Sequence, residues 1–560
     1  MSEKILIGVA WPYAYGLLHL GQVAGAYLPA DIFARYHRMK GNEVLMVSGS
    51  DQHGTPITIA AEKRKKTPAE IAAFSHRTFL ESWRKLGISY DLFTTTGTAN
   101  HAAVVQDIFL SLLRKGYIYR DTVSQAYCEK CQRFLADRYI EGECPFCHFI
   151  PARGDQCDKC GKPMNPAELI KPQCVLCGST PVFRDTEHFF LKLSAFGDRL
   201  LEWVKRQEHW RPNVRNFTLQ YLEEGLKDRA ITRDMEWGVA VPVAGFEKKR
   251  IYVWFEAVIG YLSASREWAQ SSGDGEKWRP FWEGDASSYY FIGKDNIVFH
   301  TIVWPAMLMG YGGLNLPYDV PANEFLTIEG KKISTSRNWA VWLPDYLSRY
   351  DPDPLRYVLA VNMPESSDTD FSWREFVRRN NDELVATYGN LVNRVLTFVY
   401  RNFEGKVPAS RNIDPAGERL LAHAAMALID VDHALAQCHF KQAIKAAMAL
   451  AHEANRYLDE KSPWKVIKQD RQAAADSLYV AIGAISYLRT MLSPFLPFSS
   501  QKVHEYLGFK GRVEEYGWKV AVPAGGQELV PPQPLFTKLE EKLADEETSK
   551  LGKAIPDYIT

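Results

Sequence analysis

The chain has 560 residues, several times the length of a usual single core, so we expect roughly three or four structural units. Lys plus Arg and Asp plus Glu number 67 each, so no whole-chain basic field indicates a nucleic-acid partner, although local basic faces remain open. The N-terminal sequence has no apolar segment that ends in a cleavage site. The longest uncharged run, 296–318, contains prolines and a histidine, which favours a buried helix and a turn over a membrane span. We therefore expect a cytoplasmic protein with no membrane segment.

Strand, turn, helix and strand follow one another at the start of the chain. Apolar runs predict strands at 5–9 and 43–47, with a break at 12–16 and an amphipathic helix at 20–39 that is kinked at Pro29. This βαβ order predicts an open parallel sheet of Rossmann type, in which ligands bind where strand carboxyl ends meet helix amino ends. We assign residues 1–117 to the first half of this α/β domain.

Eight of the nine cysteines form four Cys-x-x-Cys pairs within residues 118–236, a stretch of short strands and prolines that we interpret as an inserted module. Four thiolates complete a tetrahedral zinc site with no open position, which is typical of a structural site. The inner pairs predict one site, with ligands Cys144, Cys147, Cys157 and Cys160. The outer pairs predict a second site around it, with ligands Cys128, Cys131, Cys174 and Cys177. Disulfides and thioredoxin-like redox motifs are the competing interpretations.

The α/β domain is predicted to resume after the insertion. Strand-like runs at 250–262 and 289–300 indicate further strands, and residues 237–361 complete the domain. From 373 to about 507 the pattern is almost wholly helical, with glycine and proline mostly at turns. We assign residues 362–560 to a helical domain and a C-terminal tail.

Two polar stretches indicate phosphate chemistry when they are taken together. A lone His-x-Gly after a strand, as in "GLLHLGQVAG" at 16–25, is common and often merely starts a helix. The loop "EGKKISTSRN" at 329–338, however, adds two lysines, an arginine and three hydroxyl side chains. A site that adenylates with ATP needs donors aimed at the α-phosphate and a mobile cationic loop for the departing pyrophosphate. The two stretches supply both.

These stretches resemble the signature motifs of class I aminoacyl-tRNA synthetases: "HLGQ" is similar to HIGH, and "KISTS" is similar to KMSKS. The resemblance is closest to methionyl-tRNA synthetases and runs over nearly the whole chain. The cysteine pairs follow that family's order and spacing, as do the blocks "WPYAYGLLHLGQ", "SGSDQHGTPI", "YVWFEAVIGY", "FIGKDNIVFHTIVWPAML" and "NRYLDEKSPW". The resemblance implies a Rossmann-type catalytic domain, an inserted connective module with zinc knuckles, and an all-α anticodon-binding domain.

The resemblance implies that L-methionine and ATP form methionyl-adenylate and pyrophosphate, and that the methionyl group then passes to initiator and elongator tRNA(Met). Mg²⁺ would accompany the ATP phosphates, and positioning with electrostatic stabilisation would supply the catalysis. The catalytic residues implied are His19, Gln22, Lys332 and Thr335. The ATP-binding residues implied are Gly21, Gly293, Asp295, Lys332 and Thr335.

The resemblance also implies the residues of two recognition sites. The methionine pocket would consist of Tyr13, Asp51, Trp254, Ala257, Tyr261 and His300. Aromatic walls suit a polarizable thioether, and Asp51 suits the substrate ammonium. The CAU anticodon would be read, by base stacking and base-edge hydrogen bonds, at Asn390, Arg394 and Trp464. Core packing competes as an explanation of Trp254 and Tyr261, which are seven residues apart, and of Trp464.

Two departures from the family motifs lie in the signature stretches. Gln22 replaces the second histidine of HIGH, and a glutamine amide can donate to a phosphate oxygen as a neutral imidazole can. Thr335 replaces the second lysine of KMSKS and removes a positive charge. We expect the neighbouring cations of the loop to share that work, namely Lys331, Lys332 and Arg337.

Two other functions remain open from the sequence. One is a class I synthetase for leucine, isoleucine or valine, although those enzymes generally carry a much larger inserted editing domain. The other is a non-catalytic RNA-binding paralogue whose motifs drifted at Gln22 and Thr335. Amino-acid-dependent exchange of pyrophosphate into ATP discriminates the three. The dimerisation domain that some relatives append is not found in the sequence, so we expect a monomer.

Overall fold

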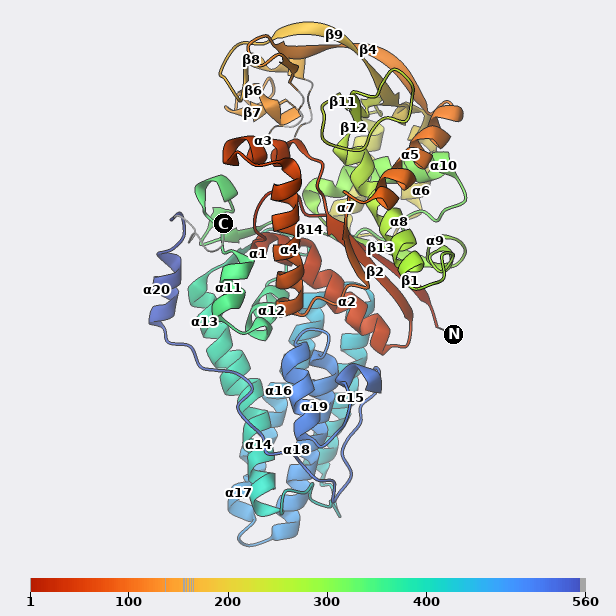
Figure 1. The fold of residues 1–560 in the computed structure, drawn as a ribbon. Coiled ribbons are helices and arrows are strands. Elements are labelled where there is room, and N and C mark those ends of the chain that lie inside the picture. Colours follow the sequence, from red (N-terminus) through yellow and green to blue (C-terminus); the bar gives the residue numbers. More distant parts are fainter. Residues whose placement is uncertain are drawn as a thin grey trace.

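A central sheet separates an inserted module at one end of the molecule from a helical bundle at the other (Figure 1). The computed structural model describes residues 2–135, 137–154, 157, 159–160, 162, 164 and 166–553. The end of the predicted C-terminal tail, residues 554–560, therefore lies outside the described residues. No helix of the described residues is long and apolar enough to cross a membrane.

The central sheet consists of five parallel strands in the order β14-β13-β1-β2-β3. They are β1 (Lys4–Val9), β2 (Glu43–Ser50), β3 (Leu92–Thr95), β13 (Ser287–Gly293) and β14 (Ala322–Asn323). The chain builds outward from β1 on one side and then returns to the other side, so the topological switch point lies at the carboxyl end of β1. The predicted Rossmann-type sheet is confirmed, and the strands predicted at 5–9 and 43–47 correspond to β1 and β2.

Alternation along β1 divides the core into two layers, because successive side chains of a strand point to opposite faces. Ile5, Ile7 and Val9 face a layer that includes α2 (Leu28–Met39) and α4 (Pro68–Leu86) and continues into the helical bundle. Leu6 faces the other layer, which contains α5 (Ala99–Arg114), α8 (Val253–Ser271) and α10 (Trp304–Tyr311). The sheet is thus covered by helices on both faces.

The helix predicted at 20–39 consists of α1 (Leu20–Gln22), a π-helical turn (Val23–Tyr27) and α2. A kink was expected at Pro29, which lacks an N–H group, and the structure has the π-helical turn directly before it. A second π-helical turn, Phe299–Val303, precedes α10, whose second residue is Pro305. The first π-helical turn follows β1, and the second follows β13, which pairs with β1. Such turns occur frequently at functional sites.

The strand predicted at 250–262 is wrong for most of its length. Only β12 (Lys249–Ile251) is extended, and α8 begins at Val253. Aromatic and β-branched residues have high strand propensity, but here they form a helix that is buried nearly all round between the sheet and α5. The run predicted at 289–300 is extended only as far as the end of β13, after which helical turns follow.

The inserted module is carried by two long antiparallel strands, β4 (Ile118–Cys128) and β9 (Val182–Leu191), which arch over the top of Figure 1. At their tip lies a small sheet in the order β7-β6-β8, made of β6 (Ile140–Glu143), β7 (Ala152–Arg153) and β8 (Ile170–Cys174). The Tyr139 hydroxyl donates to Thr58 Oγ1 at 2.8 Å, so the tip rests on α3 (Thr55–Arg64). β10 (Arg229–Ala230) and β11 (Thr232–Asp234) then lead back toward α8.

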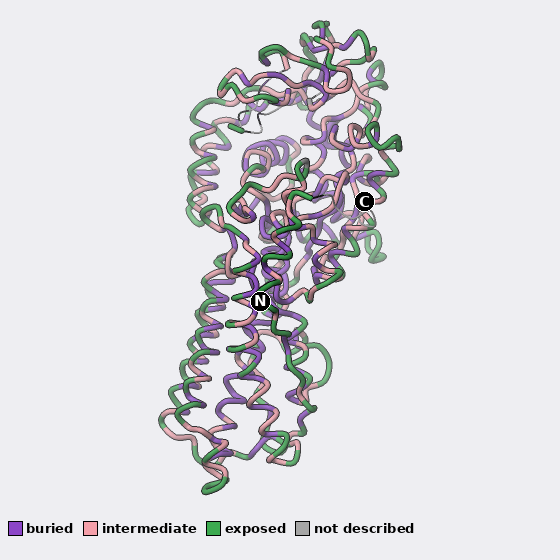
Figure 2. Tube along the Cα trace, turned by 90° about the vertical axis from the view of Figure 1, so that its left-hand side faces the viewer, coloured by how far each residue is buried: buried purple, intermediate pink, exposed green. Residues whose placement is uncertain are grey.

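The C-terminal part is a helical bundle, as predicted. Buried residues line its inside and exposed residues its outside (Figure 2). Its elements are α13 (Trp373–Arg379), a π-helical segment (Asn380–Gly389), α14 (Asn390–Asn402), α15 (Pro415–Ala436), α16 (Phe440–Lys461), α17 (Pro463–Val466), α18 (Arg471–Leu492) and α19 (Pro497–Tyr506). The isolated Cys438 is buried between α15 and α16, as expected of a small hydrophobe.

The chain leaves the bundle and returns to the α/β part. Its last helix, α20 (Lys542–Thr548), packs on α13. Thr548 Oγ1 donates to Glu329 Oε1 at 3.2 Å, and the Gly552 amide donates to the Asn338 carbonyl at 3.0 Å. These two acceptors begin and end the stretch 329–338, which we call the KISTS loop. The loop extends from a small sheet of β15 (Leu326–Ile328), β16 (Lys331–Lys332) and β17 (Thr369–Phe371).

Candidate active site and metal centres

The turn after β1 ends in a helix start that uses both polar side chains of "HLGQ". His19 is the N-cap of α1, and its backbone N–H donates to Gln22 Oε1 at 3.0 Å, as in a capping box. This bond orients the Gln22 amide and leaves its nitrogen to donate outward. Burial lowers the pKa of His19 to about 4, and its Nδ1 has no partner among the described residues. His19 is therefore a neutral imidazole that can donate a hydrogen bond without carrying charge.

Gly21 brings the two signature stretches into contact. A Cβ atom at this position would lie 2.6 Å from Cδ1 of Ile333, which is in the KISTS loop. Real Cβ contacts are not that short, so a larger residue at position 21 would push the end of the Ile333 side chain away from α1. An isolated bridge joins His19 to Trp342, which lies four residues beyond the end of the KISTS loop. The phosphate-handling arrangement expected from sequence thus has its two parts side by side.

Two lysines of the KISTS loop lie against aromatic rings. Lys331 Nζ lies 4.3 Å from the Trp339 ring centre, and Lys332 Nζ lies 5.5 Å from the Phe325 ring centre. Both lysines and Thr335 are exposed, and Thr335 begins a short 3-10 turn. The position that lacks the family's second lysine therefore faces outward beside two other cations.

Gly293 ends β13 and Asp295 follows it, at the same edge of the sheet as the turn after β1. Gly293 is the N-cap of the next helical turn, and a Cβ atom there would lie 2.8 Å from Asp295 Oδ1. The glycine therefore allows the Asp295 carboxylate to fold back over the strand end. The parallel pairing of β1 and β13 places these two residues near "HLGQ", as ligand binding at a switch point requires.

Four predicted pocket residues form two hydrogen-bonded pairs. Trp254 Nε1 donates to the Tyr13 hydroxyl at 2.6 Å. The Tyr261 hydroxyl lies 2.8 Å from His300 Nε2, while His300 Nδ1 lies 2.9 Å from the Asn296 carbonyl. Because a carbonyl can only accept, Nδ1 carries the proton and Nε2 accepts from Tyr261. Burial lowers the pKa of His300 to about 4, which agrees with a neutral ring.

Asp51 is held against the same wall by its backbone. Its amide donates to the Pro12 carbonyl and its carbonyl accepts from the Ala14 amide, both at 2.8 Å, so it is joined to the turn that carries Tyr13. The side chain is 2% exposed. Ala257 lies on α8 between Trp254 and Tyr261 and is partly buried. The structure thus joins Asp51, Tyr13 and Trp254 in one set of contacts and Tyr261 and His300 in another, and places Ala257 on the helix that carries Trp254 and Tyr261.

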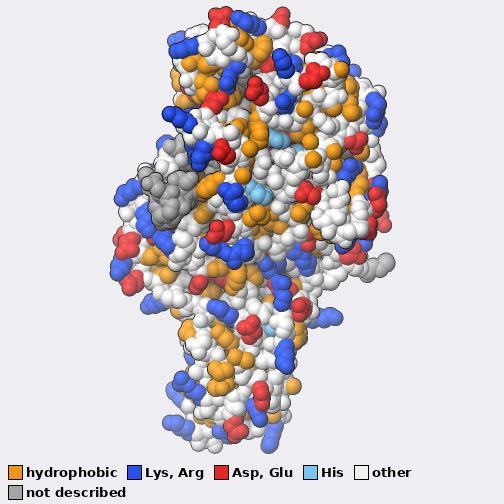
Figure 3. Space-filling model, viewed as in Figure 1, with side chains coloured by type: hydrophobic (Ala, Val, Ile, Leu, Met, Phe, Trp, Pro, Cys, Tyr) orange, Lys and Arg blue, Asp and Glu red, His pale blue; other side chains and the backbone are white. Residues whose placement is uncertain are grey.

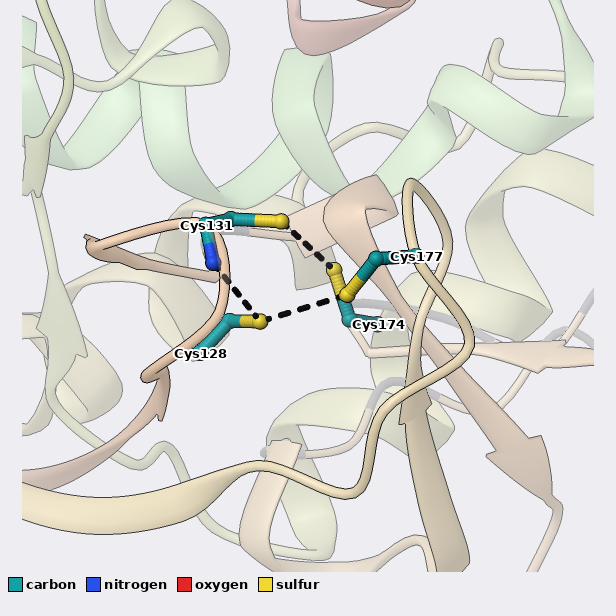
Figure 4. Close-up of side chains that lie close together, drawn as sticks. All are labelled: Cys128, Cys131, Cys174 and Cys177. Carbon is teal, nitrogen blue, oxygen red and sulfur yellow. Dashed lines mark hydrogen bonds between the residues drawn. The ribbon is translucent and has the colours of Figure 1, made fainter.

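The cysteines form two separate clusters, and in each the four sulfur atoms lie within 4.8 Å of one another. In the outer cluster, drawn in Figure 4, Cys128 and Cys177 are 3.5 Å apart and Cys131 and Cys174 are 3.9 Å apart, sulfur to sulfur. The inner cluster has separations of 3.6 and 3.9 Å. Tetrahedral zinc with bonds of about 2.3 Å places sulfurs about 3.8 Å apart, whereas a disulfide requires about 2.05 Å. Both clusters therefore fit a metal ion, consistent with zinc, and the predicted partition of the pairs is confirmed.

The predicted anticodon residues lie on α14 and α17 of the bundle. Asn390 and Arg394 are one helical turn apart at the start of α14, and Asn390 is exposed. Arg394 lies over the Trp464 ring and also forms an ion pair with Asp459 at 3.2 Å. Trp464 is partly exposed and follows Ser462, whose φ of +42° reverses the chain. The three residues thus share one surface of the bundle.

Two contacts at the site were missed from sequence. Phe299 packs edge-on against Trp254, with ring centres 4.6 Å apart, and extends the aromatic wall. Ile333 covers Gly21. The sequence could have indicated Phe299, because it directly precedes the predicted pocket residue His300. It could not have linked Ile333 to Gly21, because the two are more than three hundred residues apart.

Charges of both signs are interspersed over the face drawn in Figure 3, in agreement with the balanced composition. An RNA partner would therefore depend on local cations, such as those of the KISTS loop, and not on a field of one sign.

Comparison with protein families gives two matches. Residues 5–396 match the model for class I tRNA synthetases (M), and residues 407–554 match the anticodon-binding domain of methionyl-tRNA ligase. Among curated proteins, the methionine–tRNA ligase of Dehalococcoides mccartyi is 64% identical over 99% of this chain and 100% of its own length. That of Thermomicrobium roseum is 53% identical over 98% of this chain and 99% of its own.

A solved structure resembles the whole chain as well. The Mycobacterium tuberculosis methionyl-tRNA synthetase bound by methionyl-adenylate has a TM-score of 0.80 and 25% sequence identity, and the match covers 96% of this chain and all of that one.

Proposed function

The chain belongs to the methionyl-tRNA synthetases of class I, and from this premise we propose how its residues ligate methionine to tRNA(Met) with ATP. The single observation that carries the assignment is the seating of Ile333 on Gly21, because it holds the KISTS loop beside "HLGQ" at the edge of the sheet. The methionine and phosphate groups then meet at the carboxyl ends of β1, β2 and β13.

Binding of methionine orients its carboxylate for attack. Asp51 pairs with the ammonium group, and the thioether packs against the aromatic side chains of Trp254 and Tyr261, with Tyr13, Ala257 and His300 completing the pocket. The hydrogen bond from Tyr261 keeps the His300 ring fixed. Because these groups are already bonded to one another, little ordering is needed when the substrate enters.

Activation forms a bond between a methionine carboxylate oxygen and the α-phosphorus while the bond from that phosphorus to the pyrophosphate oxygen breaks. His19 and the Gln22 amide donate to phosphate oxygens, and Gly293 and Asp295 bind the nucleoside. Lys332 pairs with the departing pyrophosphate, and the Thr335 hydroxyl donates where relatives have a lysine. Mg²⁺, when bound with ATP, neutralises phosphate charge.

Transfer follows at the same place. The terminal ribose hydroxyl of tRNA(Met) attacks the adenylate carbonyl, and AMP leaves with the bonding electrons. Asn390, Arg394 and Trp464 bind the anticodon, far from the reacting atoms. The two cysteine clusters each hold one structural Zn²⁺, and the protein is a monomer, which light scattering after size-exclusion chromatography checks.

Methionine-dependent exchange of pyrophosphate into ATP tests the proposal. We expect exchange with methionine and not with leucine, isoleucine or valine. Lys332→Ala is expected to lower the exchange rate by about 10²-fold, as for loss of a preorganised electrostatic donor. Lys63→Ala, at an exposed lysine of α3, is the control and should leave the rate unchanged. Unchanged exchange in Lys332→Ala would contradict the role of this loop. Absence of exchange with any amino acid would instead support a non-catalytic paralogue.

A further inference from the structure

A buried glutamate lies beside the proposed methionine pocket and has no role in the reaction described above. Glu256 is on α8, next to Ala257, and its side chain is inaccessible. Its Oε1 accepts a hydrogen bond from His53 Nδ1 at 2.9 Å. Its Oε2 has no hydrogen-bond partner among the described residues. An ionised group in such a place is costly, so its presence calls for an explanation.

The second neighbour of Glu256 makes the arrangement less favourable still. His101, on α5, lies with Nε2 3.9 Å from Glu256 Oε2. Its Nδ1 is 2.9 Å from Ser263 Oγ, whose own proton goes to the Gly260 carbonyl, so His101 donates through Nδ1. Burial lowers the pKa of His101 to about 3, so the ring is neutral and Nε2 is an acceptor. Two unsatisfied acceptors therefore face each other.

At Oε2 a glutamine would serve better than a glutamate, because its amide nitrogen would donate to His101 Nε2. The contact with His101 therefore does not explain the negative charge of Glu256. That charge pairs with His53, whose turn also carries Asp51.

Asp51 is the group on which that charge acts. Asp51 and His53 form one turn after β2, in which the His53 amide donates to Asp51 Oδ1 at 3.2 Å. Trp237 packs edge-on against His53 and donates to the Gln52 carbonyl, which fixes the turn. The charged groups that influence Asp51 are Glu256 on α8 and His53 on its own turn. His101 on α5 and His300 in the pocket are neutral near pH 7.

We propose that Glu256 is a positioning residue for the ammonium group of methionine, which holds His53 in place and sets a second buried negative charge behind Asp51. The empty site then retains a proton, and the substrate ammonium replaces it. This inference rests on the proposed function, in which Asp51 binds the ammonium. It identifies a residue that decides at which pH the pocket accepts an amino acid.

The pKa of Asp51 sets the direction in which the affinity for methionine changes with pH. Burial, and then the charge of Glu256, raise the pKa of Asp51 to about 7. Burial lowers the pKa of His53, but Glu256 outweighs burial and raises it. Asp51 must be ionised to bind an ammonium, so methionine affinity is lost as the pH falls through about 7. Glu256→Gln removes one cause of the raised pKa and moves this loss to lower pH.

The experiment measures the KM for methionine in pyrophosphate exchange from pH 5.5 to 8.5. For one group that titrates near pH 7, KM of the unchanged protein rises about eightfold between pH 7.5 and pH 6. In Glu256→Gln we expect a smaller rise over that range, because the variant removes the charge that, after burial, raises the pKa of Asp51 most. Calorimetry in buffers of different ionisation enthalpy should show protons released on binding L-methioninol by the unchanged protein, and far fewer by the variant.

A matched control lies on the same helix. Glu267 Oε2 likewise has no hydrogen-bond partner in the part of the chain that the structure describes, and its Oε1 accepts from Thr94 Oγ1 at 2.8 Å. Glu267→Gln should keep the original pH profile. Binding of 4-(methylthio)butanoate, which has no ammonium, should not respond to Glu256→Gln.

The outcomes separate this inference from the proposed function. A Glu256→Gln variant with the original pH profile overturns the inference, as does a KM raised equally at every pH together with a lower melting temperature. Asp51→Asn tests the premise: an unchanged KM for methionine would remove Asp51 from the pocket and the proposed assignment with it. A raised KM in Asp51→Asn beside an unmoved profile in Glu256→Gln would overturn the role of Glu256 alone.

Discussion

Arg394 lies with its guanidinium carbon 4.6 Å from the centre of the Trp464 ring. The same guanidinium contacts Asp459, so Arg394 is held between the Trp464 ring and a carboxylate. Trp464 is thereby kept on the surface with one face covered and the rest partly accessible, which suits a platform for a single unpaired base.

Trp464→Ala should therefore weaken tRNA recognition without affecting chemistry. Loss of one stacked base costs about 1–3 kcal/mol, so kcat/KM for tRNA aminoacylation should fall by about 5- to 150-fold. Methionine-dependent pyrophosphate exchange should not change. Met426→Ala, at an exposed residue of α15 in the same bundle, serves as the control. If exchange fell in parallel with aminoacylation, Trp464 would be a packing residue of the bundle.

Gly21→Ala should disturb the contact between Ile333 of the KISTS loop and α1. The added Cβ would meet Ile333 Cδ1 at 2.6 Å and His19 Nδ1 at 3.2 Å, so the end of the Ile333 side chain must move. Displacements on this scale in a reacting site lower rates by up to about 100-fold, measured here as pyrophosphate exchange. Ile333→Val removes Cδ1, and the double variant should recover part of the loss. A double variant no faster than Gly21→Ala would show that Ile333 does not transmit the effect.

Metal analysis of the purified protein should find two zinc ions per chain. Cys144→Ser and Cys128→Ser should each retain one, because the two clusters share no ligand. Chelation should lower the melting temperature, since the cysteines are part of the buried core of the inserted module. One zinc per chain in the unchanged protein would exclude the outer site.

Asp31→Asn should be strongly destabilising. Asp31 and Arg356 are both fully buried and 2.7 Å apart, and Arg35 binds the same carboxylate oxygen at 2.9 Å. Breaking a buried pair of this kind costs about 3–5 kcal/mol in the free energy of unfolding, measured by urea denaturation. Glu43→Gln, which breaks the exposed pair with Lys4, should cost less than about 1 kcal/mol. Similar costs for both variants would contradict the burial argument.

The Asp31 carboxylate also makes the free energy of unfolding depend on pH. Burial alone would raise the pKa of Asp31, but Arg35 and Arg356 outweigh burial, and with a hydrogen bond from Ser89 they lower it to about 2. A lowered pKa in the folded state stabilises the fold above the unfolded pKa of about 4. This contribution should disappear as the pH falls from about 4 to about 2. The urea midpoint of Asp31→Asn should change less over that range.

Local patterns were sufficient to predict much of the fold. β1 and β2 lie between clear breakers, so their apolar runs indicated strands, and the cysteine spacing indicated both clusters. The same reasoning was wrong at α8. Tyr252, Val253, Trp254 and Phe255 favour a strand locally, and only burial between the sheet and α5 makes a helix there.

The site was predictable where one motif supplies it, and not where distant segments meet. Gln22 caps α1, as a glutamine three residues after an N-cap can, so its orientation follows from local sequence. The contact between Gly21 and Ile333 depends on the packing of the whole catalytic part. Glu256 could have been noticed, because an acid in the apolar run "VWFEAVIG" indicates a buried charge with a specific partner.

The return of the C-terminal segment attaches the bundle to the α/β part at a second place. The first attachment is the chain that enters through α13, and the second is the segment that ends with α20 and the contacts at Glu329 and Asn338. A bundle with a single attachment could bend about that attachment. Two attachments restrict such bending, and the second one is made at the two ends of the KISTS loop.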